Sequence, residues 1–259
     1  MRTISADGSE VHYEVAGTGD TALVFVHGWL GNTRWWDAQR DALVATYRIV
    51  QLDLVGHGRS SHTRPVWSAQ TYAQDIVAVV AAIAAPRVVL VGHSMAGAYV
   101  VAAAAHVDPA RLAAIVLVDT LKNLDAPRSQ EQIDGMLALY RADYRRAVET
   151  VLPTFLFAPT SPPDVVARVS NEFLSVTGDV AVQLIDPLYR YDPRVDASAI
   201  RVPVRGIDTD LHPNDAVANR RYFADYAIAT IAGYGHYPML ECPDAFTAQL
   251  RVTLDELGL

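Results

Sequence analysis

The sequence of 259 residues has one cysteine and no long hydrophobic run, and each shortage excludes a class of protein. Cys242 has no partner for an internal disulfide and stands outside any Cys or His spacing typical of metal sites, so we expect no bound metal. The apolar stretch 76–85 is too short to span a bilayer and is followed by Pro86, so no membrane association is expected. The first residues lack a basic start followed by an apolar core, which predicts no secretory signal and a cytoplasmic location.

Positive charge is also scarce. The chain has 21 Lys and Arg residues against 29 Asp and Glu, a formal net charge of −8 at pH 7. This balance disfavours binding to polyanions, so nucleic acid is not an expected partner. Hydrophobic residues make up 51% of the chain, which is typical of a globular protein with a sizeable core. The oligomeric state is left open.

Short apolar segments alternate with segments of helical periodicity along most of the chain. Ser68 is a plausible cap for a helix over 68–84, and Pro243 favours the start of a last helix. Strands that alternate with helices predict an α/β protein with a mostly parallel sheet and helices on both faces. The segments predicted as strands are 3–5, 11–15, 22–26, 48–52, 88–91, 112–118, 201–207 and 226–231.

The pattern changes between residues 121 and 200. Tyr and Arg residues recur there at helical spacing, followed by the apolar cluster Phe155, Leu156 and Phe157 and by several prolines. We interpret 121–200 as a helical cap inserted into a core formed by 1–120 and 201–259. Phe155 and Phe157 are then candidates for the wall of a substrate pocket, and packing of the cap against itself is the alternative.

The stretch 88–97, VVLVGHSMAG, predicts a buried strand that turns sharply into a helix with Ser94 at the apex. Only small residues fit two positions before and after such an apex, and Gly92 and Ala96 occupy these positions. The Ser94 hydroxyl would project above the sheet edge as a nucleophile. Gly-x-Ser-x-small also occurs in ordinary turns, which is the competing interpretation.

A serine nucleophile requires a base, and the base requires an orienting acid. His236 lies in a glycine-containing loop after the last predicted strand and is the candidate base. Asp210 is the preferred acid because it lies beyond a strand end, near the bend that Pro213 imposes. Asp208 would instead stabilise the turn at the strand terminus. Asp119 is the third candidate, since its strand should lie beside the one that bears the serine.

Acyl transfer also requires N–H donors directed at the developing oxyanion. The backbone N–H of Met95 would lie at the start of the predicted helix. The second donor would be the N–H of Trp29, in the loop His27-Gly28-Trp29 after a buried strand. A plain bend between strand and loop is the alternative for this segment.

Four segments together resemble the α/β-hydrolase superfamily: HG at 27–28, DLVGHGRS at 53–60, VGHSMAG at 91–97 and GHYPMLECPDAF at 235–246. Nucleophile, acid and histidine occur in the order typical of that family. The resemblance implies an α/β-hydrolase fold with an eight-stranded sheet, a helical cap between the sixth and seventh strands, and a site between cap and core. Ala96 stands where the family commonly has Gly, and the spacing of the acid loop also departs from the commoner pattern.

These observations together predict a cofactor-independent serine esterase that cleaves a small, largely apolar ester, lactone or related acyl compound through an acyl-enzyme. Ser rather than Asp at the elbow argues against the alkyl-enzyme chemistry of haloalkane dehalogenase and epoxide hydrolase relatives. Carbon–carbon bond hydrolysis and perhydrolysis use a similar triad and stay open. A slow-turnover ligand-binding or signalling protein also stays open, because fold alone does not decide function.

Overall fold

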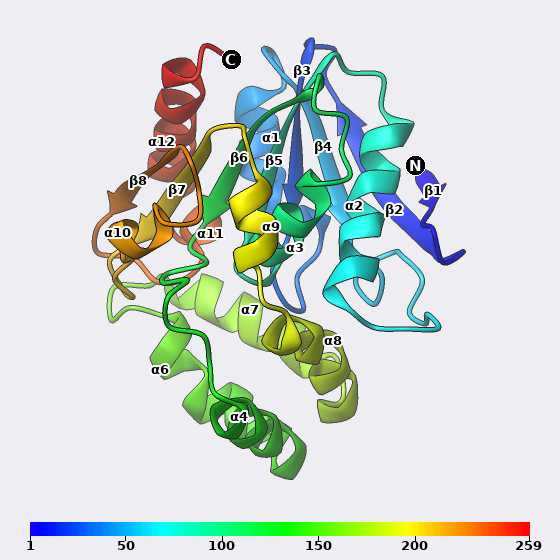
Figure 1. Ribbon diagram of the computed structural model, residues 1–259. Coiled ribbons are helices and arrows are strands. Elements are labelled where there is room, and N and C mark those ends of the chain that lie inside the picture. The colour runs from blue at the N-terminus through cyan, green and yellow to red at the C-terminus, as the bar shows by residue number, and fades with distance from the viewer.

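A sheet of eight strands forms the centre of the computed structural model, which describes residues 1–259 (Figure 1). The strand order is β1-β2-β4-β3-β5-β6-β7-β8; β2 pairs antiparallel with β1 and β4, and every other pair is parallel. The mostly parallel eight-stranded sheet is thus confirmed. The strands are β1 (Arg2–Ile4), β2 (Glu10–Ala16), β3 (Thr21–Val26), β4 (Arg48–Asp53), β5 (Arg87–His93), β6 (Leu112–Val118), β7 (Val204–Thr209) and β8 (Tyr226–Ile231).

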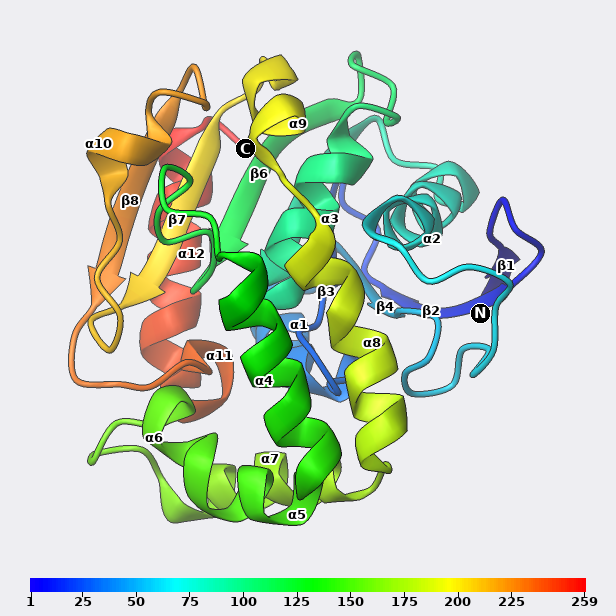
Figure 2. The same ribbon diagram turned by 60° about the horizontal axis from the view of Figure 1, so that its bottom comes forward.

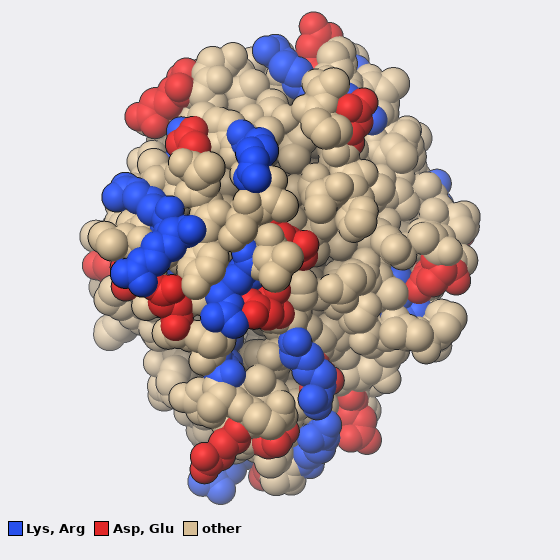
Figure 3. Space-filling view, in the orientation of Figure 1, with Lys and Arg blue, Asp and Glu red and all other residues tan.

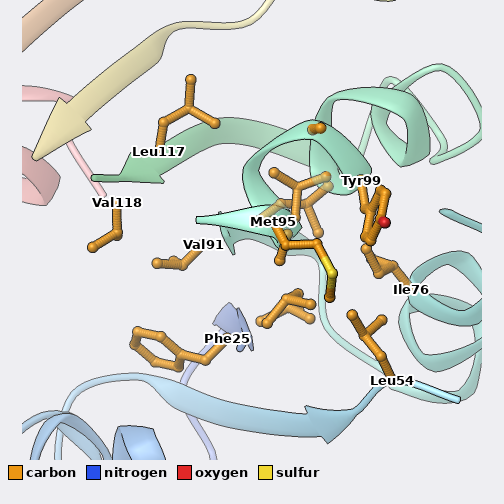
Figure 4. Packing of buried hydrophobic residues seen from close by; sticks show 14 of the residues in the cluster. Phe25, Leu54, Ile76, Val91, Met95, Tyr99, Leu117 and Val118 are labelled. Atoms are coloured by element: carbon orange, nitrogen blue, oxygen red, sulfur yellow. The ribbon is translucent and has the colours of Figure 1, made fainter. Parts of the chain in front are cut away.

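Helices cover both faces of the sheet. On one face lie α2 (Ala69–Ala82) and α3 (Met95–Ala104), and on the other α1 (Asp37–Leu43) and α12 (Pro243–Glu256) (Figure 2). Every residue of β3 is buried, as expected for a central strand covered on both sides. Figure 4 shows side chains from the strands and from α2 and α3 meeting in one apolar core, with Tyr99 and Met95 of α3 near Ile76 of α2.

The segment between β6 and β7 is mainly helical. It comprises α4 (Gln130–Ala142), α5 (Tyr144–Arg146), the π-helical turn η2 (Ala147–Val151), α6 (Pro153–Leu156), α7 (Pro163–Leu174), α8 (Gly178–Arg190) and α9 (Arg194–Ala199). Helices α4 to α7 lie beyond the carboxyl ends of the strands (Figures 1 and 2). The last helix of the segment, α9, packs against α3.

Two tryptophan side chains of the core form hydrogen bonds to helices α7 and α8 of this insertion. The indole N–H of Trp29 donates to the Ala181 carbonyl of α8 at 3.0 Å. The indole N–H of Trp35 donates to the Glu172 carboxylate of α7 at 2.5 Å. α7 buries Val165, Val169 and Phe173, which are four residues apart and therefore share one face of the helix.

Strand β7 lies later in the chain than the predicted 201–207. Pro203 has no backbone N–H, and ladder pairing with β8 begins only at Val204. The strand continues to Thr209, so Asp208 is a strand residue whose side chain is buried. This shift of two to three residues changes which carboxylates face the interior.

No helix of the structure is long and apolar enough to cross a membrane. On the face shown in Figure 3, Lys and Arg side chains lie interspersed with Asp and Glu on a largely uncharged surface.

No group of three or more His, Cys, Asp or Glu residues is placed to hold a metal ion. Cys242 is buried, with its thiol donating to the Pro238 carbonyl.

Candidate active site

Ser94 lies in the turn between β5 and α3 with a strained backbone. Its φ of 52° and ψ of −118° fall in a region that a residue with a side chain rarely adopts. The turn is tight: a Cβ at Gly92 would lie 2.7 Å from the Ala96 carbonyl oxygen, so only glycine fits at this position. The Thr120 hydroxyl donates to the Ser94 carbonyl at 2.6 Å and fixes the turn from β6.

His236 faces the serine from the loop after β8. Its Nε2 lies 2.7 Å from Ser94 Oγ. Two backbone contacts hold the residue: its N–H donates to the Leu156 carbonyl of α6 at 2.8 Å, and its carbonyl accepts from His93 Nε2 at 2.8 Å. Burial keeps the pKa of His93 well below its ordinary value, so this imidazole is neutral and acts as a fixed donor.

Asp119 completes the chain of hydrogen bonds. Its Oδ2 lies 2.5 Å from His236 Nδ1, and its side chain is fully buried. The other oxygen, Oδ1, accepts from the Thr209 N–H at 2.9 Å and from Lys122 Nζ at 2.6 Å. Burial raises the pKa of the carboxyl, but the hydrogen bond from His236 and the charge of Lys122 outweigh it and hold that pKa below its usual range. Asp119 is therefore ionised and oriented toward the imidazole.

The loop 27–29 packs directly against the serine. A Cβ at Gly28 would lie 3.1 Å from Ser94 Cβ, so the backbone of this loop approaches as closely as glycine permits. The N–H of Trp29, the next residue, takes part in none of the backbone hydrogen bonds. Met95 begins α3, where the first N–H groups of a helix lack intrahelical acceptors and the helix dipole is positive. Met95 therefore follows Ser94 directly, and Trp29 follows the glycine that packs against Ser94; their role as oxyanion donors stays a prediction.

A cavity of about 1270 Å³ opens onto these groups, and Ser94, Asp119 and His236 form part of its wall. Trp29 contributes from the core. The rest of the wall comes mainly from the helical segment and includes the apolar side chains Ile133, Met136, Leu152, Leu156 and Ile185. A strained serine hydrogen-bonded to a histidine that in turn contacts a buried carboxylate, at the wall of a largely apolar cavity, is an arrangement suited to nucleophilic attack on an apolar substrate.

A family model described as "Alpha/beta hydrolase family" matches residues 23–249. The chain belongs to the α/β-hydrolase family. It is 26% identical over 257 residues to a pimeloyl-[acyl-carrier protein] methyl ester esterase from Nitrosospira multiformis, covering 93% of this chain and 96% of the relative. It is 27% identical to a non-heme chloroperoxidase from Burkholderia pyrrocinia over 94% of this chain and 95% of that protein.

The fold agrees with that of solved α/β-hydrolases. A thermophilic esterase from Thermogutta terrifontis superposes with a TM-score of 0.83 at 24% identity, covering 99% of this chain and 98% of that structure. The protein is thus an enzyme of the α/β-hydrolase type, with esterases among its relatives.

The predicted acid requires correction, because Asp210 does not contact His236. Asp210 is exposed, and its carboxylate accepts from the Gly233 N–H at 2.8 Å. The cause is the extent of β7: Asp208 is the penultimate residue of the strand and points inward, whereas Asp210 already belongs to the surface turn. Asp119, which ranked third from sequence, occupies the position beside the histidine.

Of the two phenylalanines predicted to line the pocket, Phe155 does so and Phe157 does not. Phe155 lies at the cavity and is 56% exposed. Phe157 packs instead against Tyr237, with ring centroids 5.5 Å apart. The helix α6 ends at Leu156, so Phe157 has extended backbone, and it is not among the residues that line the cavity.

Lys122, Thr120 and His93 support the site and were not identified from the sequence. Thr120 and Lys122 follow Asp119 directly, and His93 precedes the nucleophile, so their proximity in the chain was the available signal. Their contacts depend on the pairing of β5, β6 and β7, which periodicity does not reveal.

Proposed function

We propose that this α/β-hydrolase cleaves a small, largely apolar ester or lactone by a serine mechanism. The supporting observation is the unbroken chain of hydrogen bonds from Ser94 through His236 to Asp119, at the wall of an apolar cavity. In this assignment Ser94 is the nucleophile, His236 the general base and Asp119 the orienting acid.

The reaction begins when His236 Nε2 accepts the proton of Ser94 Oγ as the oxygen attacks the substrate carbonyl carbon. The backbone N–H groups of Trp29 and Met95 stabilise the oxyanion of the tetrahedral intermediate. His236 then donates its proton to the departing alcohol oxygen, leaving an acyl-enzyme on Ser94. Water attacks the acyl group with His236 again as base, which releases the acid and restores the serine.

The cavity supports an apolar substrate. Its volume is about 1270 Å³ and apolar side chains from α4, α6 and α8 contribute to its wall, so it has room for an acyl chain or an apolar alcohol. The Nitrosospira multiformis relative is named as a methyl ester esterase, which supports ester cleavage as the reaction class.

Perhydrolysis is a second candidate, favoured by the relative named as a non-heme chloroperoxidase. Hydrogen peroxide would replace water as the attacking group on the acyl-enzyme and release a peroxy acid. The residues and the first half-reaction are the same, so the two outcomes differ only in the acceptor.

Turnover of p-nitrophenyl esters of increasing acyl length tests the proposal. The wild-type protein should hydrolyse them and form one covalent adduct with an organophosphonate, located at Ser94 by mass spectrometry. Ser94→Ala should abolish the adduct and lower kcat by about 10⁴-fold or more while the thermal unfolding profile is retained. Near-native activity of the alanine variant would exclude Ser94 as nucleophile, and tight ligand binding with negligible turnover would favour a binding role.

A further inference from the structure

The only lysine of the chain, Lys122, lies between two buried carboxylates at the active site. Its Nζ is 2.6 Å from Asp119 Oδ1 and 3.0 Å from Asp208 Oδ2. The lysine side chain is 22% exposed and forms part of the cavity wall, whereas those of Asp119 and Asp208 are 0% and 2% exposed. One cation thus bridges the carboxylate that contacts the histidine and a second one that does not.

Apart from this contact, little in the structure compensates the negative charge of the Asp208 carboxylate. Its Oδ2 also accepts from the Asn214 amide at 2.8 Å, while its buried Oδ1 has no hydrogen-bond partner. Burial raises the pKa of Asp208 to about 6; the negative charge of Asp119 adds to that rise, and Lys122 opposes it. Two carboxylates in one buried site disfavour each other's ionisation, so a cation between them decides whether both hold their charge.

We propose that Lys122 is a positioning residue for the triad: its ammonium group separates the charges of Asp119 and Asp208, so that Asp119 stays ionised and its Oδ2 is free for His236. This inference rests on the proposed serine mechanism. It also accounts for the different tasks of the two Asp119 oxygens, since Oδ1 is engaged by Lys122 and Thr209 while Oδ2 faces the imidazole.

The loop that carries Lys122 is held in place by the helix α10 (Ala216–Asn219) and the residues before it. The Lys122 carbonyl accepts from the Asp215 N–H at 2.7 Å. The preceding carbonyl, that of Leu121, accepts from the Asn219 side-chain amide at 2.8 Å, and Leu121 has a positive φ of 46°. These hydrogen bonds fix the backbone of residues 121–122, and this position places the Lys122 ammonium group near both carboxylates.

No arginine contacts either carboxylate, so Lys122 is their one Lys or Arg partner. The titratable groups that face the cluster are His236 on Asp119, His93 behind His236, and the Tyr226 hydroxyl, which accepts from the Asn214 amide at 3.0 Å. His93 is neutral, and burial raises the pKa of Tyr226, so neither supplies a charge at neutral pH. Without Lys122, no cation would separate the two buried negative charges, so the cluster would retain a proton at higher pH.

The test compares Lys122→Met, Lys122→Arg, Asp208→Asn and the double variant Lys122→Met/Asp208→Asn by the pH dependence of kcat/KM for a p-nitrophenyl ester. Lys122→Met should move the acidic limb upward by about one pH unit and lower the rate on that limb about tenfold. Lys122→Arg retains the positive charge, so the acidic limb of its pH profile should lie closer to that of the wild type than to that of Lys122→Met. Adding Asp208→Asn to Lys122→Met removes the repelling carboxylate and should recover most of the loss.

Two results would overturn the inference: an acidic limb of Lys122→Met that coincides with the wild type, or a double variant as impaired as Lys122→Met alone. Thermal unfolding of each variant at the assay pH controls for misfolding. If the wild-type protein cleaves no ester, the proposed function fails, but the inference is still tested by NMR titration of His236 in the same variants. The signal is assigned by its loss in His236→Gln, and Lys122→Met should again raise the midpoint.

Discussion

At the scale of single residues, backbone strain is concentrated at the site. Four residues other than glycine have a positive φ: Leu30, Ser94, Asp119 and Leu121. Leu30 follows the loop 27–29, Ser94 and Asp119 belong to the hydrogen-bonded chain, and Leu121 lies at the cavity. Such conformations cost free energy and persist where the surrounding structure enforces them. Here they turn the serine hydroxyl and the carboxylate of Asp119 toward the same imidazole.

The choice of acid is the residue-scale prediction. Asp119→Asn keeps the shape of the side chain but removes the charge that stabilises the imidazolium, and should lower kcat by about 10³- to 10⁴-fold. Asp210→Asn is the matched control, because Asp210 is exposed and bonds only the Gly233 N–H; its kcat should stay within about threefold of the wild type. Steady-state kinetics on one ester measures both.

A severe loss in Asp210→Asn with a mild one in Asp119→Asn would restore the assignment made from sequence. Organophosphonate labelling of Ser94 in each variant provides a second readout. The labelling rate reports the reactivity of the serine alone, because the measurement does not depend on release of a product.

At the scale of elements, the short helix α6 has two roles. Its Leu156 carbonyl accepts the N–H of His236, and its Phe155 carbonyl lies 2.8 Å from His212 Nε2. The helix therefore links the inserted segment to the loop that carries His236. A shift of α6 would move both the cavity wall and the backbone of His236, so the shape of the cavity and the position of His236 are coupled through one turn of helix.

The two phenylalanines at this helix should behave differently. Phe155→Ala enlarges the cavity and should change the ratio of kcat/KM between long and short esters by about 5- to 50-fold, with little change in Tm. Phe157→Ala removes packing on Tyr237 and should lower Tm by about 2–4 °C while leaving that ratio unchanged. A panel of p-nitrophenyl esters with a thermal scan distinguishes them, and equal effects of both variants on all esters would contradict the distinction.

At the scale of the whole molecule, a buried arginine with two carboxylate partners joins the first hairpin to α2. The Arg64 side chain is fully buried and contacts Asp7, in the turn between β1 and β2, at 2.9 Å. It also contacts Asp75 of α2 at 2.9 Å and lies over the Tyr72 ring at 5.4 Å. Arg64 is not part of the wall of the active-site cavity, so its contribution is to stability.

Removing one partner of such a pair leaves a buried charge uncompensated. Arg64→Met should lower the free energy of unfolding by about 3–5 kcal/mol, as measured by urea denaturation. Arg59→Met is the control: Arg59 contacts Glu14 with a side chain that is 57% exposed, and its loss should cost less than about 1 kcal/mol. Folded Arg64→Met enzyme should retain its kcat; a selective loss of kcat without destabilisation would contradict this interpretation.

Local sequence patterns predicted most of the fold and part of the site. Each of the eight strands falls within a few residues of its predicted segment, because buried strands read as short apolar runs between turn residues. The small residues around Ser94 and the glycine-containing loop at His236 were local signals too, and the structure places these two side chains 2.7 Å apart. The inserted segment stood out because its spacing is helical over a long stretch between strands.

The sequence by itself therefore determined the elements, their order and the two residues at the centre of the site. Only the tertiary structure decided which carboxylate contacts His236, which groups Lys122 contacts and where Phe157 packs. Which carboxylate contacts His236 depends on the extent of β7: it pairs with β6 from Val204 to Ile207 and with β8 as far as Thr209, which buries Asp208 and exposes Asp210. A carboxylate's partner is set by the register between strands distant in sequence, and no local periodicity encodes that register.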